Sequence, residues 1–165
     1  MHIYSHISDH KENFPLQSDF SVNNNDKEKG FGVYARKSFE RGSLVSKFSG
    51  TILKDITQHS LQIDAESHIY DPDFAGLLLH SCDPNIVLDM NDFTIRAIKD
   101  IREGDALTMD YASTEDYLYR QFKCLCDSDN CRQWITGRRE DVNEEGSLLL
   151  KQRNNPARIS ILKAG

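Results

Sequence analysis

The segment His80-Ser81-Cys82-Asp83-Pro84-Asn85 contains one of the four cysteines of the chain. The other three lie downstream, in Cys124-Leu125-Cys126 and, after four further residues, at Cys131. A structural zinc ion prefers four tetrahedral nitrogen or sulfur ligands, and a short loop with this spacing supplies three of them. Because Cys82 is the one cysteine left, the pattern predicts a zinc site that ties a C-terminal flap to the middle of the chain.

Disulfides, inert buried thiols and redox chemistry are the alternatives for these cysteines. Disulfides suit secreted, loop-rich chains, whereas residues 1–10 are polar and lack the apolar core of a signal peptide. Cysteines one residue apart also rarely meet the geometry of a disulfide with each other. The pattern therefore favours zinc and leaves the other interpretations open.

The composition indicates one compact, soluble domain. A chain of 165 residues is long enough for one domain and short for two. The formal net charge is −6, which argues against direct nucleic-acid binding, because that requires a basic face. The same charge is compatible with a basic partner such as lysine. No apolar run reaches membrane-spanning length. We expect a monomeric, soluble, intracellular protein of the cytoplasm or nucleus, with no membrane partner.

Short apolar or alternating runs, separated by turn residues, predict a mainly β fold. The predicted strands are residues 30–35, 44–48, 60–64, 67–70, 86–90, 93–97 and 106–111. Residues 74–79 are expected to form a short helix or turn, and Asn91-Asp92 suits a hairpin turn.

The two ends of the chain are predicted to differ. Residues 1–29 are polar, and residues 23–29 are expected to form a loop. A helix is expected over residues 140–153, because acidic residues precede apolar ones there. Gly146 weakens that helix, and Asn154-Asn155-Pro156 ends it.

Five segments occur in an order that resembles a known family. They are Gly30-Phe31-Gly32, a strand ending at Phe48-Ser49-Gly50, residues 80–85, Gly104-Asp105-Ala106-Leu107-Thr108-Met109-Asp110-Tyr111, and the three downstream cysteines. Together they resemble a SET-domain protein-lysine methyltransferase with a post-SET zinc-binding segment. The resemblance implies the SET fold, in which small curved β-sheets surround two segments threaded like a knot. The implied divisions are an N-terminal polar segment (1–27), the SET domain (28–117), a post-SET zinc-binding segment (118–137), and a C-terminal helix and tail (138–165).

The resemblance also implies an activity, the transfer of a methyl group from S-adenosylmethionine to a lysine amine of a protein substrate. By similarity, Tyr111 is the catalytic residue at the methyl-transfer point, and His80 fixes the adenine through its main chain. The implied cofactor-binding residues are Gly30, Phe31, Gly32, Leu79, His80, Phe122 and Trp134. The implied acceptor-binding residues are Phe48, Met109 and Tyr111, and the zinc ligands are Cys82, Cys124, Cys126 and Cys131. Phe122 and Trp134 have packing of the flap as their alternative role, and Asn85 is expected to brace the knot.

The sequence departs from the family at several positions, which keeps other functions open. Leu79 stands where the family usually has an asparagine that bonds the cofactor, and Phe48 stands where it often has tyrosine. Asp127 replaces a common glycine, and the stretch between Gly50 and Leu77 is short, which suggests a small or loosely held substrate. The alternatives are therefore methylation of a small-molecule amine, or a catalytically weak SET module that binds a partner. A zinc-ribbon nucleic-acid binder fits the cysteines but not the acidity.

Overall fold

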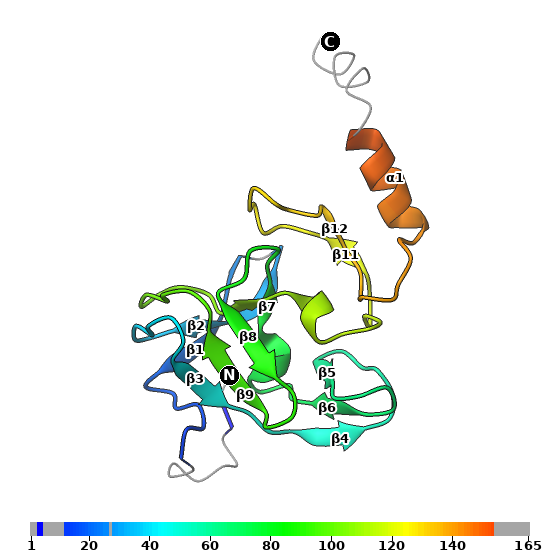
Figure 1. Ribbon diagram of the computed structural model, residues 1–165. Coiled ribbons are helices and arrows are strands. Elements are labelled where there is room, and N and C mark those ends of the chain that lie inside the picture. Colours follow the sequence, from blue (N-terminus) through cyan, green and yellow to red (C-terminus); the bar gives the residue numbers. More distant parts are fainter. Residues whose placement is uncertain (1–2, 5–11, 27, 154–165) are drawn as a thin grey trace.

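The computed structural model describes residues 3–4, 12–26 and 28–153, and these residues fold mainly as small β-sheets (Figure 1). The strands are β1 (Phe20–Asp26), β2 (Gly30–Ala35), β3 (Leu44–Lys47), β4 (Thr51–Leu53), β5 (Ser60–Gln62), β6 (His68–Tyr70), β7 (Leu79–His80), β8 (Ile86–Asp89), β9 (Thr94–Ala97), β10 (Thr108–Met109), β11 (Phe122–Lys123) and β12 (Trp134–Ile135). The helical elements are the 3-10 turns η1 (Ala75–Leu77) and η2 (Tyr111–Ser113) and the helix α1 (Glu144–Arg153).

Within the described residues, the strands form five separate sheets. Antiparallel pairing joins β1 to β2, orders one sheet as β3-β9-β8 and orders another as β4-β6-β5. The strand β7 pairs with β10 in parallel, and β11 with β12 antiparallel. Figure 1 shows β11, β12 and α1 together at one end of the molecule, away from β4, β5 and β6. Among the described residues, no helix is long and apolar enough to cross a membrane.

Two local predictions are wrong, and each has a physical reason. The loop expected over residues 23–29 overlaps the strand β1, because Phe20 at the start of this strand is buried and stacks on Phe39 with ring centroids 5.5 Å apart. This burial overrides the weak strand propensity of the asparagines. The helix begins at Glu144 rather than at residue 140, because the Asn143 side chain accepts the Gly146 N–H at 2.9 Å and so acts as its N-cap. The expected stop at residues 154–156 lies outside the described residues.

Two buried groups fix the turn that leads into residues 80–85. The Asp71 carboxylate accepts the N–H groups of Phe74 and Ala75, at 3.1 and 2.8 Å, and so caps η1. The Tyr4 hydroxyl donates to the same carboxylate, and it accepts the Ser49 N–H at 3.0 Å. Tyr4 and Asp71 therefore fix the backbone of the turn that leads through residues 77–79 into β7.

The two motif segments lie side by side, as the SET fold requires. The Asn85 amide donates to the Ala106 carbonyl and its oxygen accepts the Thr108 N–H, both at 2.8 Å. The Ser81 N–H donates to the Met109 carbonyl at 3.0 Å. Asn85 thus braces the crossing of the two segments, the role expected from the sequence.

Candidate active site

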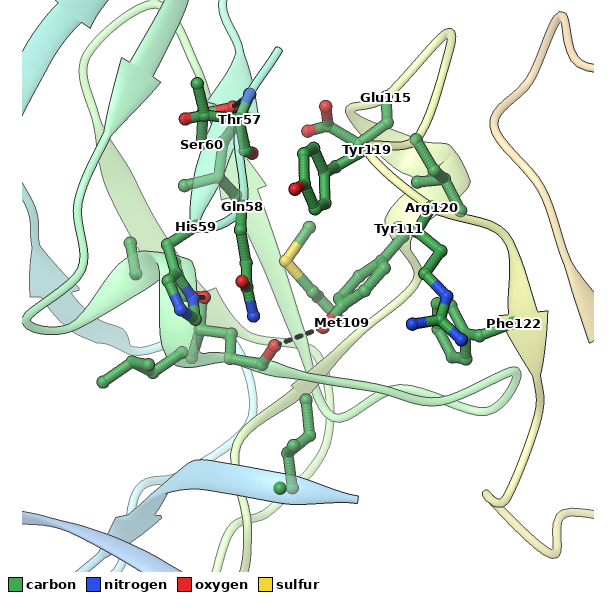
Figure 2. A pocket seen from close by; sticks show the side chains of 18 of the residues that line it. Thr57, Gln58, His59, Ser60, Met109, Tyr111, Glu115, Tyr119, Arg120 and Phe122 are labelled. Carbon is green, nitrogen blue, oxygen red and sulfur yellow. Dashed lines mark hydrogen bonds between the residues drawn. The ribbon is translucent and has the colours of Figure 1, made fainter. Parts of the chain in front are cut away.

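An open pocket of about 470 Å³ lies where β7 and β10 meet. Residues 56–61 form one wall, η1 and Leu78 form the floor, and residues 115–122 form the opposite wall. Figure 2 shows the labelled side chains of both walls converging on Met109 and Tyr111. A second pocket of about 460 Å³ adjoins it and adds His80 and Leu125 to its lining. Tyr111, Leu79 and Phe122 line both pockets.

Tyr111 is held at the junction of the two pockets. Its hydroxyl donates to the Leu78 carbonyl at 2.8 Å, the dashed line in Figure 2. Its ring meets the edge of Phe122 with centroids 5.8 Å apart. Burial and the nearby Glu115 carboxylate raise the pKa of the Tyr111 hydroxyl, so it stays protonated at neutral pH. Because its proton is committed to Leu78, its oxygen lone pairs are available to an incoming N–H group.

His80 connects Tyr111 to the cysteine cluster. Burial lowers the pKa of the His80 imidazole to about 4, so the ring is neutral at physiological pH. Its Nδ1 accepts the Tyr111 N–H at 3.3 Å, which places the ring proton on Nε2. Nε2 lies 3.5 Å from the Cys82 sulfur and can donate to it. A metal-binding thiolate commonly receives such outer hydrogen bonds.

The four cysteines come together as their spacing predicts. Their sulfur atoms all lie within 4.8 Å of one another, and the sulfurs of Cys82 and Cys124 are 3.8 Å apart. Zinc–sulfur bonds of about 2.3 Å in a tetrahedron place sulfurs about 3.8 Å apart. The Arg132 N–H also donates to the Cys82 sulfur at 3.3 Å. Both the spacing and the all-thiol donor set therefore fit a closed zinc site held by Cys82, Cys124, Cys126 and Cys131.

Several expected cofactor residues line the pockets. Gly30, Phe31, Leu79 and Phe122 line the first pocket, and His80 joins the second. Gly32 lies behind Leu79, where a Cβ would be 2.6 Å from the leucine Cδ1. The absence of a side chain at Gly32 thus makes room for Leu79. Apolar and aromatic side chains beside Lys29, Arg120 and Lys123 suit a purine nucleoside that carries a carboxylate.

Two expected site residues lie elsewhere, in the packed interior. Phe48 is buried and meets the edge of Phe93, with centroids 5.6 Å apart. Trp134 is buried, and its Nε1 donates to the Gln121 side chain at 2.9 Å. Its ring leaves no room for a Cβ on Gly146, so Trp134 packs α1 against the flap. Neither residue lines the two pockets, and their contacts with acceptor and cofactor stay predictions.

Other residues of the pocket were missed by reasoning from the sequence. They are residues 56–60, Leu78, Glu115, Tyr119 and Arg120. Most lie on turns whose position depends on the folding of distant sheets, which no local pattern reveals. Glu115 gave no sequence signal beyond its place four residues after Tyr111, and in the structure its N–H donates to the Tyr111 carbonyl at 2.9 Å.

Comparison with known proteins gives one family. The SET domain family matches residues 30–112, half of the chain. Methyltransferase flvH of Aspergillus flavus is 38% identical over 79 residues, covering 47% of this chain and 43% of that protein. The H3 lysine-9 specific histone-lysine N-methyltransferase dim-5 of Neurospora crassa is 26% identical over 161 residues, covering 66% of this chain and 49% of that protein. The chain therefore spans less than half of each of these relatives.

The fold is also similar to solved structures. The crystal structure of KRYPTONITE in complex with mCHG DNA and SAH matches with a TM-score of 0.56 and 26% identity. That match covers 66% of this chain and 27% of the other. The methyltransferase domain of human SETMAR matches with the same TM-score of 0.56 at 19% identity, covering 72% of this chain and 58% of the other, and supports the fold alone.

Proposed function

The chain belongs to the SET-domain family, and on that premise we propose that it is an S-adenosylmethionine-dependent N-methyltransferase acting on a lysine amine of a protein. The observation that carries this proposal is the meeting of two pockets at Tyr111. In-line methyl transfer requires donor and acceptor to approach one point from opposite directions. The pocket lined by His80 and Phe122, together with the Gly30–Phe31 edge of the first pocket, suits the cofactor, and the part of the first pocket between residues 56–61 and Tyr119 suits the acceptor.

The residues at this point act by positioning. When bound, S-adenosylmethionine supplies a methyl group on a cationic sulfonium. The Tyr111 oxygen and the Leu78 carbonyl accept hydrogen bonds from the acceptor amine and aim its lone pair. Leu77, Met109 and Phe122 exclude water, and a dry site beside a positive charge lowers the pKa of the amine. The chain thereby favours the neutral amine that can attack.

The inferred zinc ion has a structural role. Four thiolates close its coordination sphere and leave no open position for catalysis. Through Cys82 it would hold the β11–β12 flap, and with it Phe122, against β7. The cofactor pocket therefore depends on metal-held contacts between segments distant in sequence.

A small-molecule amine is the alternative acceptor. One wall of the acceptor pocket is the short segment 56–61, which offers little surface for gripping a peptide. A catalytically weak binding module is a further alternative, because the Leu79 side chain makes no hydrogen bond to a cofactor. Both alternatives predict poor transfer to protein lysines.

The test is incubation of the zinc-loaded protein with methyl-labelled cofactor and a cell lysate. The proposal predicts label in the lysines of one or a few proteins, identified by mass spectrometry. Label confined to the small-molecule fraction would select the small amine. Absence of label from both fractions, together with absence of cofactor binding, would contradict the proposed function.

A further inference from the structure

A buried carboxylate lies in the acceptor pocket, one turn beyond Tyr111. Glu115 is 6% exposed and lines the pocket beside Tyr119 (Figure 2). Its charge is close enough to raise the pKa of the Tyr111 hydroxyl. Charged carboxylates are rarely buried unless they are paired, so this placement requires a reason.

The hydrogen bonds of Glu115 occupy only one of its oxygens. Oε1 accepts both the Gln62 N–H and the Thr114 hydroxyl, each at 2.9 Å. Oε2 accepts no hydrogen bond from residues 3–4, 12–26 or 28–153. Oε2 is not among the fully enclosed side-chain atoms that lack a partner, so it is reachable from the pocket, and a carboxylate has capacity for several donors. The fixed Oε1 therefore orients the group and leaves Oε2 for a donor within the pocket.

Neighbouring cations do not neutralise Glu115. The Arg138 side chain binds Asp116 at 3.0 Å and donates to the Thr114 carbonyl at 3.1 Å. Arg120 lies in the same pocket, yet within the described residues no cation lies in ion-pair distance of Glu115. Burial raises the pKa of this carboxyl, and the two hydrogen bonds and the charge of Arg138 offset only part of that rise. A cationic ligand would relieve that cost.

We propose that Glu115 Oε2 binds the acceptor amine as its ammonium ion and selects alkylammonium groups over neutral acceptors. The inference rests on the proposed function and deepens it by assigning a specificity-determining residue. The ammonium is drawn into the pocket by Glu115 and releases its proton to solvent through the open side of the pocket, and the neutral amine then reacts beside Tyr111 and Leu78. Lysine side chains and small alkylamines share this chemistry, whereas alcohols do not.

The test uses binding rather than turnover, so it is independent of methyl transfer. The probes are n-butylammonium, which mimics a lysine side chain, and the neutral n-butanol. The reporter is the methyl resonance of Met109, which lines the pocket, measured by NMR with S-adenosylhomocysteine present. Wild-type protein should bind n-butylammonium about tenfold more tightly than n-butanol, the scale of a charged hydrogen bond. Equal binding, or no binding of n-butylammonium, would overturn the assignment without any mutation.

The variant Glu115→Gln tests the residue itself. Its amide oxygen can still accept from Gln62 and Thr114, so the local fold should persist, which the unfolding midpoint checks. The Kd of n-butylammonium should rise about tenfold, while that of n-butanol stays unchanged. Glu103→Gln makes the same change of charge on an exposed turn and should leave both values unaltered. An unchanged Kd for n-butylammonium in folded Glu115→Gln, or an equal rise in Glu103→Gln, would refute the proposal.

Discussion

Tyr111 is held by contacts on both sides of its ring and at its backbone. Its hydroxyl donates to Leu78, its N–H donates to His80, and its ring contacts Phe122. Because these contacts fix the oxygen at the junction of two pockets, a small chemical change there separates positioning from folding. The neighbouring Tyr119 lines the same pocket but is 64% exposed, which makes it a matched control.

Tyr111→Phe should lower methyl transfer by about a hundredfold, the scale for losing one positioned polar group. Steady-state assays with labelled cofactor measure the rate, and calorimetry should show nearly unchanged cofactor affinity. Tyr119→Phe removes an exposed hydroxyl and should lower the rate by much less. Equal rates for wild type and Tyr111→Phe would show that the hydroxyl is only structural.

The close approach of Gly32 and Leu79 gives a further prediction. An alanine Cβ at position 32 would lie 2.6 Å from the Leu79 Cδ1, so Gly32→Ala should push the leucine toward the cofactor pocket. Overpacking of this kind should weaken cofactor binding by about tenfold. Leu79→Ala in the same chain should restore affinity. If the double variant binds as weakly as Gly32→Ala, the clash is not the cause.

Prediction from sequence succeeded for residues whose chemistry requires a particular type. The four cysteines lie together because the metal-ligand spacing is local for three of them, and Asn85 bonds across the crossing as expected. Prediction from sequence did not identify Glu115 as a pocket residue, because a carboxylate on a polar turn resembles an ordinary surface residue. The sequence also could not show that the Phe48 ring packs against Phe93 in the core. The side to which a side chain points from a curved sheet depends on tertiary packing.

At the scale of elements, alternation located most strands, and errors occurred where a strand depends on pairing and buried contacts that its own pattern does not show. The strand β1 depends on pairing with β2, and η2 replaces the expected end of the last SET strand. The Asp110 carboxylate accepts the Ala112 N–H at 3.1 Å and so begins this turn. The turn places Glu115 in the wall of the first pocket. The helix α1 was predicted, but its start depends on the Asn143 cap.

The contact between α1 and the flap gives an element-scale prediction. Gly146→Ala improves helix propensity, yet its Cβ would overlap the Trp134 ring. We therefore expect the free energy of unfolding to fall by about 1–3 kcal/mol, which is the usual cost of overpacking. Trp134 is the only tryptophan, so its fluorescence should shift toward the emission of exposed indole. Glu145→Ala, on the exposed side of the same turn, should leave emission and stability unchanged.

At the scale of the whole molecule, zinc is expected to join the flap to the SET core. Cys82→Ser should lose the co-purifying equivalent of metal, since three thiolates from one loop would no longer be tied to β7. Metal analysis of fresh protein checks this, with Asp83→Asn as the control on the same segment. Zinc-free fresh wild-type protein with four reactive thiols would refute the site.

The central claim is that distant segments form one S-adenosylmethionine pocket, which the zinc-held flap closes. Calorimetric titration of the zinc-loaded protein with S-adenosylmethionine tests it most directly, because it needs no knowledge of the acceptor. The account predicts one equivalent bound, and an affinity at least about tenfold lower after a chelator removes zinc and frees Phe122 from its place. Zinc-loaded, folded protein that shows no binding at millimolar cofactor would contradict the claim.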